Sequence, residues 1–319
     1  MNRATYPVLA ALLGGCTLAP DYDRPEAPVP EEWPAGPAYP EADAGLPQAS
    51  ALDWRGFYTD EKLRRVISIA LANHRDLRLA ALNVELARAL YGIQRGELYP
   101  ALYAAGNGGE SRSSADLTAP GQPRTAKRFA LDLGILSWEL DFFGHLRSLR
   151  DEALEGYLAS EQAARGARIL LVSSVADAYM SLAADREALT LAQRTLEAQQ
   201  DSLDLVRRQY ELDIATEIDL CRAQSSVEAA RVEVARFVRQ VAQDENALRL
   251  LAGAPVQTEF LAADLQAIGP PRDFSAGLSS EVLLRRPDIL AAEHRLKGAN
   301  ALIGAARAAF FPSISLTSA

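Results

Sequence analysis

A stretch without proline runs from Gly144 to about Tyr210. As a single helix rising about 1.5 Å per residue it would be roughly 100 Å long, too long for a compact globular core. Apolar residues recur at every seventh position in its second part and in a following series, and the runs from Leu182 to Tyr210 and from Leu220 to Leu248 are equal in length. The first series is Val175, Leu182, Leu189, Leu196, Leu203 and Tyr210, and the second is Leu220, Val227, Val234, Val241 and Leu248. Two successive heptad seams predict an antiparallel coiled-coil hairpin, although a plain coiled-coil stalk has the same periodicity.

The two predicted helices meet near residue 215. Asp213 suits a turn, and Thr216 followed three residues later by Asp219 is typical of a helix N-cap. The return helix is expected to end at Gly253, because a proline follows two residues later. The long helices are therefore predicted over residues 144–210 and 216–252.

The segment 278–319 repeats an earlier part of the chain at an offset of 212 residues. Both copies pass from an Ala/Leu/Arg-rich helical pattern to an aromatic–proline pair, ending in Pro100 and Pro312, where an extended backbone is favoured. The identical pairs are Leu71/Leu283, Asp76/Asp288, Ala80/Ala292, Ala87/Ala299, Ala89/Ala301, Leu90/Leu302, Gly92/Gly304, Arg95/Arg307 and Pro100/Pro312. We expect a helix-to-strand junction in each copy and an incomplete duplication: a first repeat over 59–253, a connector over 254–277, and the start of a second repeat over 278–319.

The first repeat begins with helices predicted over 59–98, capped by Thr59 and interrupted near Asn73. A hairpin is predicted over 100–141, because a Gly/Ser/Pro-rich middle separates two extended flanks. On the second flank apolar residues alternate with small or polar ones, as in strands of outer-membrane barrels and equally in hairpins of soluble proteins. The apolar residues are Phe129, Leu131, Leu133 and Ile135. The alternation shifts after Ile135, which predicts a bulge or the strand end, and Trp138, Phe142 and Phe143 suit a membrane interface.

The first fifteen residues have the early cation, short apolar run and small residues of a secretory signal. Leu13 to Cys16 resembles a bacterial lipobox, which predicts a lipidated Cys16; an ordinary signal peptide or a misassigned start is the alternative. Thr17 follows the cysteine where inner-membrane lipoproteins have Asp, and this resemblance favours the outer membrane. The following segment, 16–58, is expected to lie extended along the folded body or to be a disordered tether. Its prolines before residue 51 are Pro20, Pro25, Pro28, Pro30, Pro34, Pro37, Pro40 and Pro47.

Composition restricts the function. The 42 acidic residues exceed the 33 basic ones, and a net charge of −9 argues against nucleic-acid binding. The two cysteines, Cys16 and Cys221, leave no disulfide framework if the first is lipidated. The three histidines lack metal-ligand spacing and no catalytic motif occurs, so neither an enzyme nor a metal site is predicted. No later segment approaches the ~20 apolar residues of a membrane helix, so a membrane crossing is expected to be a β-barrel.

Several motifs resemble one family. These are the run RRPDI at 285–289, the run AAFFPS at 308–313, the junction 138–144, the hairpin tip 210–219 and the lipobox. The chain resembles the outer-membrane factors, the TolC-like channels of tripartite efflux pumps, and in particular their NodT-type lipoprotein branch. The resemblance implies a mixed α/β membrane protein in which a trimeric twelve-stranded β-barrel continues into a long-helix α-barrel. This chain would be mostly α-helical with one β-hairpin.

The resemblance also implies a passive exit duct for drugs or other small molecules. Its partners would be two further copies of the chain, a periplasmic membrane-fusion adaptor, an inner-membrane RND pump and outer-membrane lipid, with no nucleic acid and no cofactor besides the covalent lipid, typically palmitate, on Cys16. The strand-to-helix junction would be formed by Gly144, Pro100 and Pro312. The tip expected to dock the adaptor is Leu212, Asp213, Ile214, Ala215 and Thr216.

Two expectations qualify this picture. The family commonly has glycine at the position of Asp213, so a left-handed backbone there would cost more in this chain. A full member continues beyond the third strand, so the 319 residues alone are not expected to form a working channel. The alternative function is a lipid-anchored periplasmic coiled-coil scaffold without a pore, which would have no need of a lipid-facing hairpin at 100–140.

Overall fold

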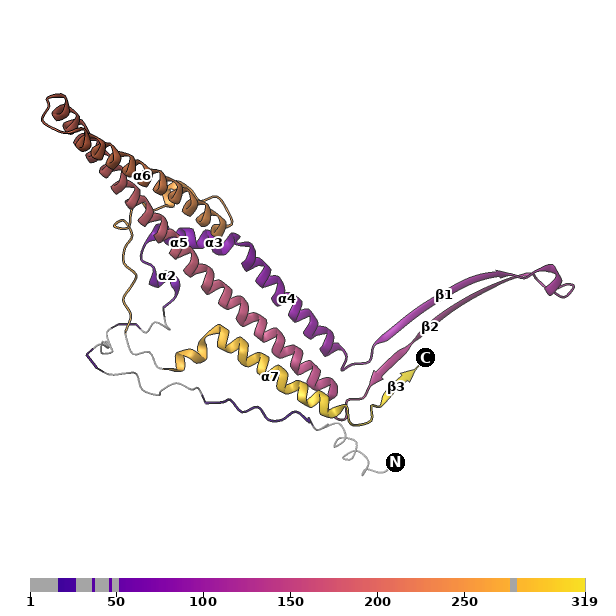
Figure 1. Cartoon of the computed structure of the whole chain (residues 1–319). Helices are drawn as coiled ribbons and strands as arrows, with labels where there is room; N and C mark the ends of the chain where they lie inside the picture. The colour runs from indigo at the N-terminus through magenta and orange to yellow at the C-terminus, as the bar shows by residue number, and fades with distance from the viewer. Residues whose placement is uncertain (1–16, 27–35, 38–45, 48–51, 276–279, 319) are drawn as a thin grey trace. The chain divides into compact units, whose positions relative to one another are not determined.

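The computed structural model describes residues 17–26, 36–37, 46–47, 52–275 and 280–318 (Figure 1). Its long helices and its strands follow the predicted order along the chain, with short 3-10 turns between them. The elements are α2 (Trp54–Phe57), α3 (Glu61–Asn73), α4 (Arg75–Gly96), β1 (Leu102–Arg112), η2 (Ala115–Leu117), β2 (Thr125–Glu139), α5 (His145–Glu211), α6 (Glu217–Ala252), η3 (Thr258–Phe260), η4 (Ser280–Arg285), α7 (Pro287–Ala308) and β3 (Ser315–Ser318).

The chain forms two compact units, which are described separately. One contains Leu82–Gln162 and Asp288–Ala319 together with the N-terminal residues up to Ala27. The other contains Pro28–Ala81 and Ala163–Pro287. The fold is mostly α-helical with a small sheet, as predicted.

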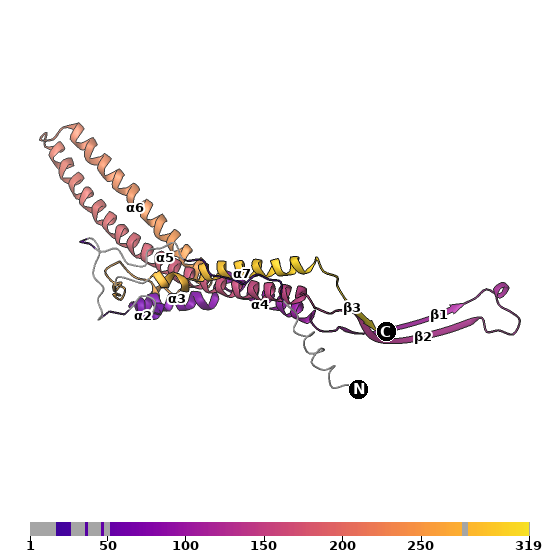
Figure 2. The same ribbon diagram turned by 90° about the horizontal axis from the view of Figure 1, so that it is seen from below.

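The coiled-coil hairpin is present. In both views α6 runs back alongside the second half of α5 (Figures 1 and 2). Of the predicted seam residues only Tyr210 is exposed; the others are buried or half-buried. The Arg186 guanidinium donates to Glu245 at 2.8 Å across the two helices, and the midpoint of this pair lies between residues 215 and 216. This pair is centred on the predicted meeting point of the two helices near residue 215.

Capping side chains fix the ends of these helices. The Thr216 hydroxyl accepts from the Asp219 amide while the Asp219 carboxylate accepts from the Thr216 amide, which is a capping box at the start of α6. Gly253 ends α6 with a φ of 66°, and a Cβ at this position would lie 2.6 Å from the Asn73 carbonyl oxygen. Only glycine fits both the left-handed backbone and this contact.

The prediction that Thr59 caps the first long helix was wrong. Asp60 is the N-cap of α3, and its carboxylate accepts from the Leu63 amide at 2.6 Å. The Thr59 hydroxyl instead donates to the Pro270 carbonyl at 2.7 Å, which ties the start of α3 to the connector. Asp and Thr are both good N-cap residues, so the sequence alone does not determine which of two such neighbours caps the helix.

The second unit has a hydrophobic core built from three helices and the connector. α3 contributes Leu63, Val66 and Ile67, and α5 contributes a longer row that includes the fully buried Tyr179. Leu248 from α6 and Leu261 from the connector complete it. The Arg186 guanidinium also donates to the Ala262 carbonyl at 2.7 Å, so one side chain joins α5, α6 and the connector.

α5 is the helix in the described part of the chain that is long and apolar enough to cross a membrane, judged by length and composition only. The sequence-based exclusion of every such segment was therefore too strict. A buried core helix meets the same criteria. Leu171, Val175 and Tyr179 are buried in the core of the second unit, which accounts for the apolar composition of α5.

The first unit contains an antiparallel sheet of order β1-β2-β3. β1 and β2 pair without interruption from Leu102/Ile135 to Arg112/Thr125. The β2–β3 register shifts between Ile135 and Trp138, where the sequence predicted an irregularity. β2 continues to Glu139, so the shift is an irregularity within the strand rather than its end.

The predicted helix-to-strand junction occurs in both copies of the repeated segment. α4 starts at residue 75 and ends at 96, and α7 starts at 287 and ends at 308, which places both ends 212 residues later. Each helix is followed within seven residues by a strand. The division of the whole chain into a first repeat, a connector and a second repeat remains a prediction.

Candidate functional site

The β1–β2 hairpin has one strongly apolar face, and that face is uncovered. Phe129, Leu131 and Leu133 are 81%, 83% and 71% exposed. Opposite them β1 places Gly108, Gly106 and Ala104, and the Phe129 ring lies over Gly108. Small residues beside large ones leave the aromatic and leucine side chains as the outermost layer of this face.

The height of this face matches a bilayer. Nine residues separate Phe129 from Trp138, or about 31 Å along a strand. A tilt of about 40° reduces this to about 23 Å along the membrane normal, close to the ≈25 Å apolar band of outer-membrane barrels. The opposite face carries Ala130, Asp132 and Gly134, which would line an aqueous interior.

Aromatic side chains gather at the base of the hairpin, where strands meet helices. The rings of Phe143 and Phe311 stack with centroids 4.5 Å apart. The indole of Trp138 donates to the Leu98 carbonyl at 3.2 Å, and Phe310 is 90% exposed. Aromatic rings at this level are typical of the membrane–water interface.

Two of the predicted junction residues lie close together in this region. Gly144 has a φ of 75°, which turns the chain from β2 into α5. A small depression is lined by residues 139–143 and by His145 on one side, and by Phe311, Pro312 and Ser313 on the other. Pro100 lies between α4 and β1, two residues after the Leu98 carbonyl that accepts from Trp138. The junctions of both repeated segments are thus joined through β2.

Residues 17–26 of the N-terminal arm lie against α7 in antiparallel direction. Their partners recur at intervals of three or four residues, on one face of the helix. At the start of the arm, Arg307 donates to the Leu18 carbonyl at 3.1 Å and Ala19 packs against Gly304. In the middle, Asn300 donates to the Pro20 carbonyl at 2.7 Å, and the Lys297 ammonium lies 5.2 Å from the Tyr22 ring centre. At the end, Arg24 donates to Glu293 at 3.0 Å. Residues 17–26 are therefore ordered along α7, in agreement with the expectation of an arm that lies extended along the folded body.

The charged end of this contact, between Arg24 and Glu293, was not predicted from the sequence. Hydrogen bonds from Arg24 and the ion pair with Lys297 lower the pKa of Glu293. No local pattern could have revealed the pair, because Arg24 and Glu293 are 269 residues apart. Cys16 lies outside the described residues, so its lipidation stays a prediction.

The predicted tip links α5 to α6. Asp213 has a φ of 57°, the left-handed conformation expected to cost more than with glycine. The amides of Ile214 and Ala215 both donate to the Gln209 carbonyl, at 2.8 and 3.2 Å, and close the end of α5. Leu212 and Ile214 are about 70% exposed, so the tip presents apolar side chains to the outside.

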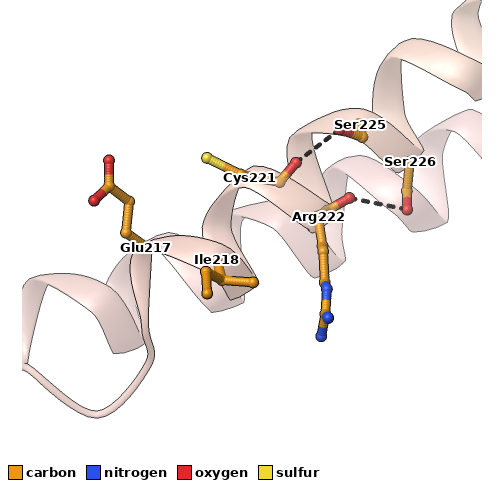
Figure 3. Close-up of a pocket in the computed structure, with 6 residues that line it drawn as sticks. All are labelled: Glu217, Ile218, Cys221, Arg222, Ser225 and Ser226. Carbon is orange, nitrogen blue, oxygen red and sulfur yellow. Dashed lines mark hydrogen bonds between the residues drawn. The ribbon is translucent and has the colours of Figure 1, made fainter.

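The first turns of α6 extend this surface. Figure 3 shows Glu217, Ile218, Cys221 and Arg222 side by side along the helix, with the Ser225 and Ser226 hydroxyls turned back to backbone carbonyls. Cys221 is exposed and free. Within the described residues, no group of three or more His, Cys, Asp or Glu side chains is placed to hold a metal ion.

Comparison with known proteins decides the family. The sequence model described as "Outer membrane efflux protein" matches residues 66–254 and 278–319. The chain belongs to the outer membrane efflux protein family. It is 46% identical over 315 residues to the probable efflux pump outer membrane protein TtgC of Pseudomonas putida, covering 97% of this chain and 64% of that protein. It is 44% identical to the outer membrane protein OprJ of Pseudomonas aeruginosa, again covering 97% of this chain and 64% of that protein.

Solved structures of the family share the fold. The open state of the Neisseria gonorrhoeae MtrE outer membrane channel matches with a TM-score of 0.76 and 37% identity, covering 95% of this chain and 66% of that one. A membrane protein from Pseudomonas aeruginosa matches with a TM-score of 0.75 and 43% identity, covering 95% and 67%. The fold is therefore that of TolC-like outer membrane channels, as predicted. The chain spans less than two thirds of the length of the two Pseudomonas relatives, TtgC and OprJ, and 66–67% of the two solved chains.

Proposed function

We propose that this chain forms part of the exit duct of a tripartite, RND-type efflux system, through which drugs or other small molecules passively leave the cell. The observation that supports this most is the continuity of two elements through Gly144. An exposed apolar strand face about 23 Å tall leads directly into α5, whose 67 residues extend about 100 Å. Such a polypeptide suits a membrane crossing that continues as a tunnel on one side.

The proposed assembly is a homotrimer. Apolar residues outside the heptad seams remain exposed on the long helices, including Leu191, Leu205, Val232 and Val238, at 51–66%. A two-helix hairpin that worked alone in water would have polar residues there. Neighbouring long helices in an α-barrel would cover these side chains and close the tunnel wall.

The tip is the proposed docking site for a periplasmic adaptor. It offers Leu212, Ile214 and Ile218, all more than 60% exposed, at the far end of the helical hairpin. An inner-membrane pump would select and energise the substrates, and the duct itself would perform no chemistry. We propose no cofactor beyond a lipid on Cys16, which would anchor the arm on the periplasmic side of the outer membrane.

The scaffold alternative is less favoured. A periplasmic coiled coil without a pore has no use for the hairpin face of Phe129, Leu131 and Leu133, which is uncovered by any other described part of the chain. Its exposure in water would promote aggregation. Residence in the outer membrane removes this cost.

Docking at the tip is tested with the native thiol. Cys221 lies about one and a half turns from the tip, and we expect a maleimide to label it in isolated membranes and to be blocked by purified adaptor. Ala215→Arg should abolish the protection, and in a protein completed with the rest of the second repeat it should also abolish efflux. The matched control is Ala119→Arg in the β1–β2 connection, which should change neither. Full efflux with Ala215→Arg would overturn the assigned tip.

A further inference from the structure

The far end of the β1–β2 hairpin concentrates positive charge in an otherwise acidic chain. Residues 110–128 contain four cations and two acids, whereas the whole chain has a net charge of −9. The cations are Arg112, Arg124, Lys127 and Arg128, and the acids are Glu110 and Asp116. This local excess lies at the opposite end of the strands from the aromatic base.

The strand register divides these charges between the two faces. Lys127 is two residues from Phe129, and Arg112 is paired with Thr125, a further two residues on, so both lie on the apolar face. Arg128 is paired with Gly109 and lies on the face of Asp132. Successive residues of one strand, Lys127 and Arg128, therefore point to opposite sides of the sheet.

Position relative to the apolar band defines the surroundings of Arg112 and Lys127. Two residues of a tilted strand advance about 5 Å along the membrane normal, so Lys127 would lie just outside the band that starts at Phe129. Charged side chains on a lipid-facing surface are costly at the midplane and nearly free of cost at the interface. Both cations would thus lie in the headgroup layer.

These two cations are available for a ligand. Lys127 is 3.6 Å from Glu110, and both side chains are more than half exposed, so this ion pair is weak. Arg112 forms no ion pair with any described residue. Because Arg112 and Lys127 are diagonal neighbours across the two strands, roughly 7–8 Å apart at the backbone, their long side chains can converge on one phosphate or hold two adjacent ones.

We propose that Arg112 and Lys127 form a binding site for the anionic phosphate headgroups of lipids in the outer leaflet. The inference rests on the proposed membrane function, because it requires the face of Phe129 to contact lipid. The partner follows from charge complementarity: a positive belt directly beyond an apolar band fits a lipid with exposed phosphates. Glu110 would compete with those phosphates for Lys127.

Binding to lipid vesicles tests the site with the full chain. Two compositions are compared, phosphatidylcholine alone and phosphatidylcholine mixed with a lipid that carries exposed phosphate monoesters, and bound protein is measured by flotation. We expect tighter binding to the phosphate-bearing vesicles. Arg112→Gln should weaken this preference about fivefold, which corresponds to about 1 kcal/mol per cation at an anionic surface. Added salt should reduce it for the unaltered chain.

Two further variants are included, one expected to change the preference in the opposite direction and one that serves as a matched control. Glu110→Gln should strengthen the preference, because it frees Lys127. Arg128→Gln removes the same charge from the same hairpin end but from the other face, and it should leave the preference unchanged. All three positions are exposed, so we expect folding to be unaffected, and circular dichroism is the check.

Each outcome bears on a defined claim. An equal loss with Arg112→Gln and Arg128→Gln would mean that only net charge matters, and would overturn the site. Equal binding of the unaltered chain to both compositions would overturn the site but leave the membrane function intact. Absence of binding to every vesicle would overturn the membrane function on which the inference depends.

Discussion

The helical core of the second unit and the β1–β2 hairpin use similar side chains in opposite ways. Leu63, Tyr179 and Leu182 are at most 2% exposed, because α3, α5 and α6 cover one another. Leu131 and Phe129 are more than 80% exposed on a sheet face that nothing in the described chain covers. The first region is stable through its own contacts, whereas the second becomes stable only in an apolar solvent.

The largest expected effect on stability comes from a substitution in the hydrophobic core. Leu182→Ala should destabilise the helical unit by about 2–5 kcal/mol, because Leu182 is 1% exposed and its removal leaves a cavity. Urea unfolding followed by circular dichroism measures this. Leu131→Ala provides the comparison and should leave the unfolding curve unchanged. A large shift from Leu131→Ala would mean that the hairpin face is covered within the chain.

The hairpin should respond to charge according to face. Leu131→Arg should reduce insertion into vesicles, by less than the ~2–4 kcal/mol expected at the bilayer midplane, because it places a charge inside the apolar band about 5 Å from its edge. Ala130→Arg, the neighbouring position on the opposite face, should insert normally. Flotation of the two variants distinguishes them, and similar behaviour of both would contradict the assignment of the lipid-facing side.

A backbone change at the end of α6 should destabilise the protein less than Leu182→Ala does, but more than a substitution at the surface does. Gly253→Ala places a Cβ in a left-handed conformation and 2.6 Å from the Asn73 carbonyl oxygen. We expect at least about 1–2 kcal/mol from the backbone conformation alone. Thermal unfolding is the readout, and Gly109→Ala in β1, where a Cβ meets nothing within 4 Å, is the control.

The smallest effect concerns the arm, which neither a core nor a membrane stabilises. The pKa of Glu293 is lowered through its hydrogen bonds with Arg24, so the contact should persist above the usual carboxyl pKa and weaken as the pH falls through the lowered value. Limited proteolysis within residues 17–26 should become faster only at strongly acidic pH. Glu293→Gln should be cleaved faster at neutral pH, and its cleavage should lose the pH dependence.

The periodicity of the sequence determined which parts of the fold could be predicted. The heptad seams of α5 and α6 and the alternation around Leu131 are dictated by burial and exposure along regular elements, and both predictions were confirmed. The turn at Asp213, the cap at Thr216 and the end at Gly253 depend on local chemistry and were also predictable.

Contacts between distant segments could not be predicted from the sequence. Nothing around Arg24 indicates Glu293, and nothing around Thr59 indicates Pro270, because each pair is formed only when the chain folds back over more than two hundred residues. The stacking of Phe143 on Phe311 was likewise unpredicted, although each ring had been noted in its own motif. Regular elements are determined locally, whereas the partners of loops and arms are determined by tertiary structure.

The antiparallel contact of the arm with α7 has a consequence for the order of events during biogenesis. Residues 18 to 24 complete their contacts with residues 293 to 307, so this part of the arm waits for a segment that is synthesised at least 269 residues later. Closing so long a loop is entropically costly and occurs after local helices have formed. Until then residues 18 to 24 have no docking partner on α7. The predicted lipidation of Cys16 would therefore have the whole of this time in which to occur before the neighbouring segment 18–24 docks.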